Sequence, residues 1–230
     1  MRDSLILWDI DGTLVCTDRA GERGLLQMIR DDYGRDLGDQ LPVDLRGRTD
    51  TSIVRDLLEF LGRPVTDEEQ VRFRDGYLAL LPKMLGSGQA RLHPGVREAL
   101  EAVHAHPEIH QALLTGNLRA GAELKLSHLG IWNYFEFGAF ANDSSNRNEL
   151  GPFALARAKE KLGIEFPPER VYIIGDTPHD IACGKAIGAK TIGVATGSFS
   201  VAELEKQQPT YVFEDLADTQ ALLKCVLDPA

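Results

Sequence analysis

Two pairs of carboxylates in the sequence have a spacing that suits phosphate chemistry. Asp9 and Asp11 lie at the end of a short apolar run, and Asp176 lies at the end of another, with Asp180 one turn further on. A phosphate ester resists an anionic nucleophile, so a carboxylate that attacks phosphorus needs a cation beside it. Asp9 and Asp176 can supply hard oxygen ligands for Mg²⁺. In isolation, the second pair could equally be a turn followed by a helix start that Asp180 stabilises.

Asp11 is the candidate proton carrier. A leaving alkoxide must gain a proton, and the water that hydrolyses an aspartyl phosphate must lose one, so one carboxyl group can perform both steps in succession. Gly12 and Thr13 come next in the sequence, and they would let the backbone approach a phosphate closely. The sequence therefore indicates Asp9 as nucleophile and Asp11 as general acid and base.

A third segment offers phosphate-binding groups. Thr115, Gly116 and Asn117 follow the apolar run 112–114 and precede a helical pattern. At such a position a phosphate oxygen can meet a hydroxyl group and free backbone N–H groups. A plain turn is the alternative interpretation of these three residues.

Short apolar runs that end in these polar segments predict the scaffold. Such runs are typical of strands buried on both faces, and helical patterns separate them along the chain. They cover residues 5–8, 112–114, 171–174 and 191–194. This alternation predicts an α/β fold, a Rossmann-like parallel sheet with helices on both faces. The chemistry-bearing residues would then meet at the carboxyl edge of one sheet.

Residues 17–91 interrupt the alternation. Helical signals dominate there, including a capping-box pattern at 66–69 and an apolar stripe of helical spacing at 53–61. We predict an inserted α-helical cap domain at 17–91, and a catalytic core made of residues 1–16 and 92–230.

Composition restricts the partners and the compartment. The 230 residues carry a formal charge of −10, which disfavours nucleic acid as a partner. Three widely spaced cysteines indicate reduced thiols, and the sequence has neither an export signal nor an apolar stretch that could span a membrane. We therefore expect a cytoplasmic monomer or homodimer that acts on a small-molecule phosphate ester.

The segments 9–15, 113–117 and 175–180 together resemble three motifs of the haloacid dehalogenase (HAD) superfamily, in the same order. The resemblance implies a HAD-like core, attack by Asp9 and a Mg²⁺ cofactor. Its protein ligands would be the Asp9 carboxylate, the Asp11 backbone carbonyl and Asp176, with Asp180 binding through water or orienting the others. The insert is similar to the helical cap of the phosphoglycolate phosphatase-like branch.

The sequence departs from this family at the remaining motif, which usually contains a lysine followed by proline. Residues 146–152 contain no lysine, and Arg147 is the candidate cation because a guanidinium can neutralise both a carboxylate and a phosphate. Lys159 and Lys161 are the rivals. They would lie near the far end of the helix that begins at Pro152, where lysines usually face solvent.

Arg48 is the candidate for recognising a second anionic group of the substrate, with Arg46 as the less favoured choice. The alternative interpretation is that both arginines lie in a solvated surface loop. Two functional alternatives stay open: a phosphoryl-transfer mutase with the same residues, and a non-catalytic binding module. The acidic Asp11 disfavours a dehalogenase, because dehalogenases of this superfamily lack an acidic residue at that position. The prediction is a Mg²⁺-dependent phosphomonoester hydrolase that forms an aspartyl phosphate.

Overall fold

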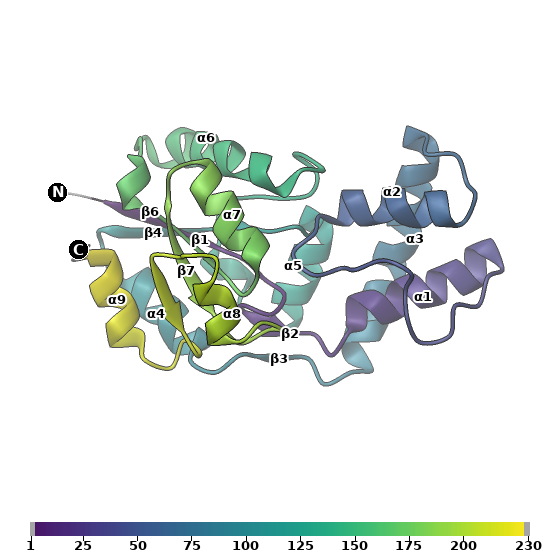
Figure 1. Cartoon of the computed structure of the whole chain (residues 1–230), viewed down its shortest axis with the longest axis horizontal. Helices are drawn as coiled ribbons and strands as arrows, with labels where there is room; N and C mark the ends of the chain where they lie inside the picture. Colours follow the sequence, from purple (N-terminus) through teal and green to yellow (C-terminus); the bar gives the residue numbers. More distant parts are fainter. Residues whose placement is uncertain (1–2, 228–230) are drawn as a thin grey trace.

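The computed structural model describes residues 3–227, and a six-stranded sheet with parallel pairing throughout forms its centre (Figure 1). In spatial order its strands are β5 (Gly138–Ala139), β4 (Ile109–Leu114), β1 (Ser4–Trp8), β6 (Val171–Gly175), β7 (Lys190–Val194) and β8 (Tyr211–Phe213). β1 lies between β4 and β6, so the segments after these three strands meet at the carboxyl edge of the sheet. Ligand sites of parallel α/β sheets form at this edge. The predicted parallel sheet is confirmed.

Helices cover both faces of the sheet, as predicted. Successive strand residues point to opposite faces, so Ile6 and Trp8 pack in one hydrophobic cluster and Leu5 and Leu7 in another. The first cluster includes residues of α4 (Val96–Ala105), α5 (Arg119–His128) and α9 (Thr219–Leu227). The second includes residues of α6 (Leu150–Leu162) and α7 (Pro178–Ala186). The short helix α8 (Val201–Glu205) contacts β7 and β8.

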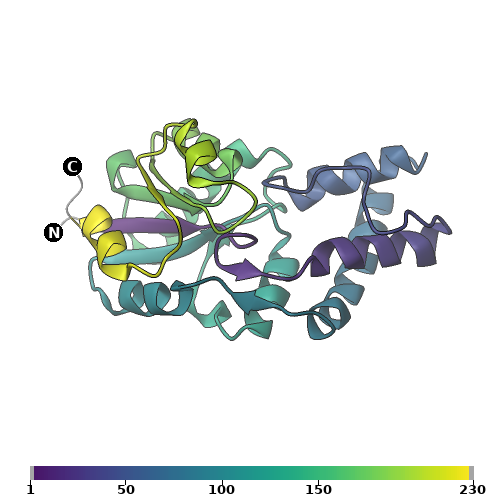
Figure 2. The ribbon, with the colours of Figure 1, turned by 60° about the horizontal axis from the view of Figure 1, so that its bottom comes forward.

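Three helices lie together beyond the carboxyl edge of the sheet (Figures 1 and 2). They are α1 (Ala20–Tyr33), α2 (Asp50–Phe60) and α3 (Asp67–Gly86), and a hydrophobic cluster of their own joins them. We call residues 17–91 the helical insert. β2 (Val15–Cys16) and β3 (Arg91–Leu92) pair antiparallel where the insert leaves and rejoins the chain. The division into two domains stays a prediction, and this ribbon lies at both of its boundaries.

Side-chain caps explain where two helices of the insert begin. Thr49 accepts a hydrogen bond from the backbone N–H of Ser52, and Thr66 accepts one from Glu69. The helix start predicted at 66–69 is therefore confirmed. The reciprocal half of the predicted capping box is not observed, because the Glu69 carboxylate pairs instead with Arg63 at 3.1 Å.

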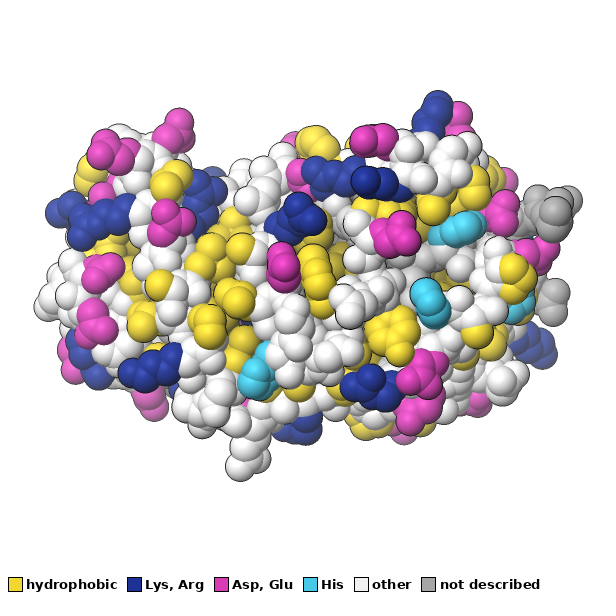
Figure 3. Space-filling model, turned by 180° about the vertical axis from the view of Figure 1, so that it is seen from behind, with side chains coloured by type: hydrophobic (Ala, Val, Ile, Leu, Met, Phe, Trp, Pro, Cys, Tyr) yellow, Lys and Arg dark blue, Asp and Glu magenta, His cyan; other side chains and the backbone are white. Residues whose placement is uncertain are grey.

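The surface carries mixed charges, and the cysteines are unpaired, as the sequence predicts. In the view of Figure 3, acidic and basic side chains are intermixed, and hydrophobic side chains appear in small groups. Cys16, Cys183 and Cys225 are free thiols. Among residues 3–227, no helix combines the length and the apolar character that crossing a bilayer requires.

Candidate active site

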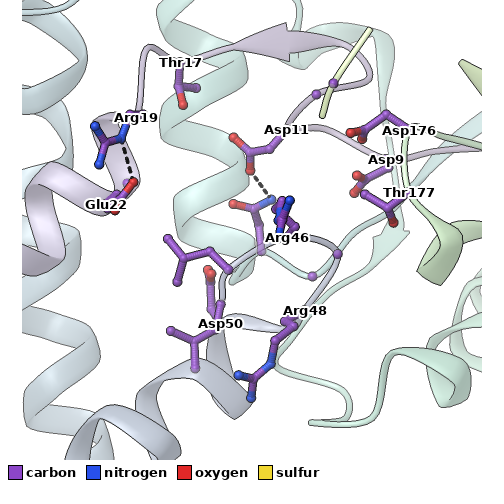
Figure 4. Close-up of a pocket in the computed structure, with 18 of the residues that line it drawn as sticks. Asp9, Asp11, Thr17, Arg19, Glu22, Arg46, Arg48, Asp50, Asp176 and Thr177 are labelled. Carbon is purple, nitrogen blue, oxygen red and sulfur yellow. Dashed lines mark hydrogen bonds and ion pairs between the residues drawn. The ribbon is translucent and has the colours of Figure 1, made fainter. Parts of the chain in front are cut away.

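Three buried carboxylates meet at the carboxyl edge of the sheet. Asp9 follows β1 and Asp176 follows the neighbouring β6, while Asp180 lies in the first turn of α7. Each offers an oxygen within 4.8 Å of the others, and their exposed fractions are only 4%, 4% and 1%. Figure 4 shows Asp9 and Asp176 side by side at one wall of a pocket. The structure thus brings together the three carboxylates of the predicted metal site, whose fourth predicted ligand is the Asp11 backbone carbonyl.

Burial and like charge perturb these carboxylates. Burial raises the pKa of Asp9 to about 6; nearby Arg147 opposes this shift, while Asp180 and Asp11 add to it. Burial also raises the pKa of Asp176 well above its ordinary value, and repulsion from Asp180 and Asp9 adds to the shift. A carboxylate cluster with too little positive charge nearby is a setting that a divalent cation would relieve.

The surroundings of Asp176 leave room for its carboxylate. Gly12 has a positive φ of 83°, and a Cβ atom at Gly12 or Gly197 would overlap with the Asp176 side chain. The Thr13 hydroxyl donates to Asp176 Oδ1 at 3.1 Å. Thr13 is fully buried. It therefore supports the carboxylate, whereas the sequence had suggested a substrate contact.

Arg147 supplies the cation of this cluster. It begins a short 3-10 helix, η2 (Arg147–Glu149), directly before α6, and its side chain is buried. Its Nη2 lies 2.9 Å from Asp9 Oδ1 and also contacts Asp180. The rival Lys159 is exposed and pairs with Glu165 at 3.0 Å, and Lys161 is exposed as well. Arg147 is therefore the candidate that the structure brings to Asp9.

Asp180 stabilises the start of α7 and also contacts Arg147, while its predicted role at the metal site stays a prediction. Its Oδ2 accepts hydrogen bonds from the Thr177 backbone N–H at 3.0 Å and from the Thr177 hydroxyl at 2.8 Å. These bonds complete a capping box at the start of α7. Oδ1 faces the cluster and contacts Arg147. The same side chain thus begins a helix and holds the cation in place.

The Thr115–Asn117 segment lies beneath the helical insert. Thr115 is fully buried, and its hydroxyl oxygen accepts a hydrogen bond from Asn117 Nδ2 at 2.8 Å. The Gly116 carbonyl accepts one from the backbone N–H of Asp50 at 2.6 Å, and a Cβ at Gly116 would overlap with the Arg48 carbonyl. Gly116 therefore permits a close backbone approach by the insert.

Asp11 belongs to a second polar cluster that the sequence did not reveal. Lys125 of α5 is 5% exposed, and its Nζ lies 2.5 Å from Asp11 Oδ2 and 2.5 Å from Asn117 Oδ1. Asn117 Nδ2 donates to the same Asp11 oxygen at 2.8 Å. The sequence offers one signal for a buried Lys125: it lies three residues after Ala122, so both side chains lie on the inward face of the helix.

The pocket extends from both clusters into the helical insert. Apolar side chains of the insert, including Leu25, Ile53 and Tyr77, line it opposite Asp9 and Asp11. Arg48 lines it too, but its Nη2 binds Asp56 at 2.6 Å and its guanidinium points away from Asp9 and Asp176 (Figure 4). Arg46 pairs with Asp44 at 2.8 Å.

The chain is similar to several known proteins over nearly its whole length. The probable phosphatase IndB of Dickeya dadantii is 25% identical over 98% of this chain and 97% of its own length. A phosphoglycolate phosphatase of Aquifex aeolicus is 27% identical over 95% of this chain and 96% of its own length. The crystal structure of β-phosphoglucomutase from Clostridium difficile has a similar fold, with a TM-score of 0.74, 20% identity, and coverage of 99% of this chain and 98% of that one. A sequence model of the haloacid dehalogenase-like hydrolases matches residues 6–185. The chain therefore belongs to the haloacid dehalogenase-like hydrolase family.

Proposed function

We propose that this protein is a Mg²⁺-dependent phosphatase that hydrolyses a small phosphate monoester through an aspartyl phosphate on Asp9. One observation carries the proposal: Asp9 is buried at a strand end, 2.9 Å from Arg147, among carboxylates that can hold a divalent cation. The phosphatase names of relatives that match nearly the whole chain support this reaction class. The protein would act in the cytoplasm as a monomer or homodimer.

The first step transfers the phosphoryl group to the protein. An Asp9 oxygen forms the new bond to phosphorus while the bond from phosphorus to the ester oxygen breaks. Asp11 gives its proton to the leaving oxygen, which departs as an alcohol. The side chain of Asp11 is 40% exposed and lines the pocket, so a leaving group can reach it.

The second step regenerates the carboxylate. Asp11, now ionised, takes a proton from water, and the resulting nucleophile attacks phosphorus of the aspartyl phosphate. The bond from phosphorus to the Asp9 oxygen breaks, inorganic phosphate leaves, and Asp11 is protonated again. One carboxyl group thus serves both half-reactions, and no other proton carrier is required.

Mg²⁺ would be held by Asp9, Asp176, Asp180 and the Asp11 backbone carbonyl, and it would supply positive charge to the phosphoryl oxygens. The donors fit such an ion, because among residues 3–227 Arg147 is the one cation that pairs within this group of three buried carboxylates. Arg147 offsets part of the negative charge that Asp9 and the phosphate bring together.

Phosphate contacts and selectivity come from neighbouring loops. Gly12, Thr13, Thr115, Gly116 and Asn117 would surround the phosphoryl group, with Thr13 acting through Asp176. The helical insert acts as a cap over the ester group, and its apolar wall suits a small carbon skeleton. The name of the phosphoglycolate phosphatase relative supports a phosphoglycolate-like substrate. Arg48 contributes once it leaves Asp56.

Phosphate release from a panel of phosphorylated metabolites, with and without Mg²⁺, tests this function. We expect release that needs Mg²⁺ and no bisphosphate activator. Acid quench and peptide mapping should find phosphate on Asp9. Label on another residue, or full turnover in excess chelator, would contradict the mechanism. A strict requirement for a bisphosphate would identify a mutase.

A further inference from the structure

Lys125 is a buried charged side chain that the mechanism above does not use. It lies on α5, a helix of the core, and reaches the pocket beside Asp11 and Asn117. Its Nζ is 2.5 Å from an oxygen of each. Burying the lysine costs desolvation energy, and its attraction to Asp11, whose side chain is 40% exposed, offsets only part of that cost. The position of this pair at the pocket wall indicates a role in the reaction.

The contacts of Lys125 leave one Asp11 oxygen for chemistry. Lys125 Nζ and Asn117 Nδ2 both donate to Oδ2. Between described residues, Oδ1 accepts no hydrogen bond. A side chain as exposed as Asp11, at 40%, would otherwise sample several rotamers. Two donors on the same oxygen fix the plane of the carboxylate and direct the other oxygen.

The helical insert surrounds the same lysine. Tyr77 of α3 and Asp50 of α2 lie near Lys125, and both line the pocket. Asp50 Oδ2 also accepts the backbone N–H of Leu118, directly before α5, at 2.8 Å. The insert therefore binds the residue before α5, and two of its polar side chains lie near the buried lysine.

We propose that Lys125 is a positioning residue that fixes the Asp11 carboxylate through Oδ2, so that Oδ1 faces the leaving oxygen and later the attacking water. This inference rests on the proposed role of Asp11. Proton transfer by Asp11 does not itself require Lys125, so the two roles can be tested separately. Displacements of about 1 Å in a catalytic group cost on the order of 100-fold in rate.

A single-turnover experiment with p-nitrophenyl phosphate separates the two half-reactions. Release of p-nitrophenol reports phosphorylation of the enzyme, and this good leaving group needs little help from an acid. Release of inorganic phosphate reports hydrolysis of the aspartyl phosphate, which needs Asp11 as base. Lys125→Met should keep p-nitrophenol release within about threefold of wild type and slow phosphate release about 10- to 100-fold.

The remaining variants separate positioning from a general structural effect. Lys125→Arg should recover much of the lost rate, Lys161→Met, at an exposed lysine, should behave as wild type, and Lys125→Met should add no further loss to Asp11→Asn. Lys125→Gln, which keeps a polar group in the cavity, replaces Lys125→Met if the latter does not fold.

Equal slowing of both steps, an unchanged phosphate release, or a full additional loss in the Asp11→Asn background would overturn the role of Lys125. Absence of any aspartyl phosphate in the wild type would instead overturn the proposed function, and the role of Lys125 with it.

Discussion

The Arg147 guanidinium lies 2.9 Å from Asp9 Oδ1, and both side chains are almost excluded from water. Arg147 also contacts Asp180, so one cation holds the carboxylates that follow two neighbouring strands. Both contacts come from one nitrogen, Nη2, and a guanidinium has further donors in the same plane, which an ammonium group lacks. The arginine at this position is therefore suited to bind a carboxylate and a phosphate together.

Replacing Arg147 tests whether this cation takes part in turnover. Arg147→Ala should reduce kcat by about two to three orders of magnitude, as expected when a group that stabilises developing charge is deleted. Arg147→Lys should recover part of the loss, because it restores the charge but not the planar set of donors. Steady-state kinetics with p-nitrophenyl phosphate measures both, with circular dichroism to check folding.

Lys159→Ala is the matched control, since Lys159 is exposed and pairs with Glu165 away from the carboxylate cluster. It should match the wild type. An inactive Lys159→Ala enzyme together with an active Arg147→Ala enzyme would show that the lysine is the catalytic cation.

The raised pKa of Asp9 should make metal-free stability depend on pH. Folded Asp9 keeps its proton up to a pKa of about 6, mainly because it is buried. The unfolded chain releases that proton near pH 4, so the free energy of unfolding should fall as the pH rises from 4 to 6. Relative to Asp9→Asn, which cannot titrate, the wild type should lose on the order of 3 kcal/mol over this range. Urea unfolding in excess chelator measures the difference, and a pH-independent difference would contradict it.

Metal binding should depend more on Asp176 than on Asp180. Protein groups already bind both Asp180 oxygens: Thr177 donates to Oδ2, and Arg147 pairs with Oδ1. For Asp176, by contrast, the hydrogen bond between described residues is the one from Thr13 to Oδ1. Asp176→Ala should therefore weaken Mg²⁺ affinity by a larger factor than Asp180→Ala in isothermal titration calorimetry. Asp143→Ala, which removes an Arg157 partner outside the cluster, should leave the affinity unchanged. The opposite order would place Asp180 nearer the ion.

The strand-end residues could be predicted because parallel strands share one edge. Asp9, Asp176 and Thr115 each follow a buried strand directly, so their proximity follows from the order of the strands. Arg147 could be predicted from its place before a helix start.

Lys125 could not be predicted, because its contact with Asp11 depends on how α5 packs against the segment after β1. The bond from Thr13 to Asp176 and the pairing of Glu69 with Arg63 arise in the same way. These contacts join residues through tertiary packing, and local patterns do not specify them.

Arg48 provides a test of selectivity. Its guanidinium is held by Asp56 at 2.6 Å and by Ser52 at 3.3 Å, so recognition of a substrate anion requires an exchange of partners. Arg48→Ala should then reduce kcat/KM for the preferred metabolite about tenfold more than for p-nitrophenyl phosphate. Arg55→Ala, which removes the other arginine bound to Asp56, is the control. Equal effects on both substrates would leave Arg48 a structural residue of the insert.

Gly116 tests whether the contact between the insert and the Thr115–Asn117 segment matters for turnover. A Cβ at Gly116 would overlap with the backbone carbonyl of Arg48 and lie 3.1 Å from Arg147 Nη1. The backbone cannot yield as a flexible side chain can, so Gly116→Ala should push the insert away and lower kcat/KM about 10- to 100-fold.

Gly86→Ala is the matched control for this substitution. Gly86 ends α3, and a Cβ there would meet no atom within 4 Å. Alanine favours helix by up to about 1 kcal/mol over glycine, so this variant should keep full activity and melt no lower than the wild type. Limited proteolysis should cut the insert faster in Gly116→Ala than in Gly86→Ala, because an insert that has left the core exposes its loops. Identical digestion and identical kcat/KM in the two variants would show that the approach of Arg48 to Gly116 is dispensable.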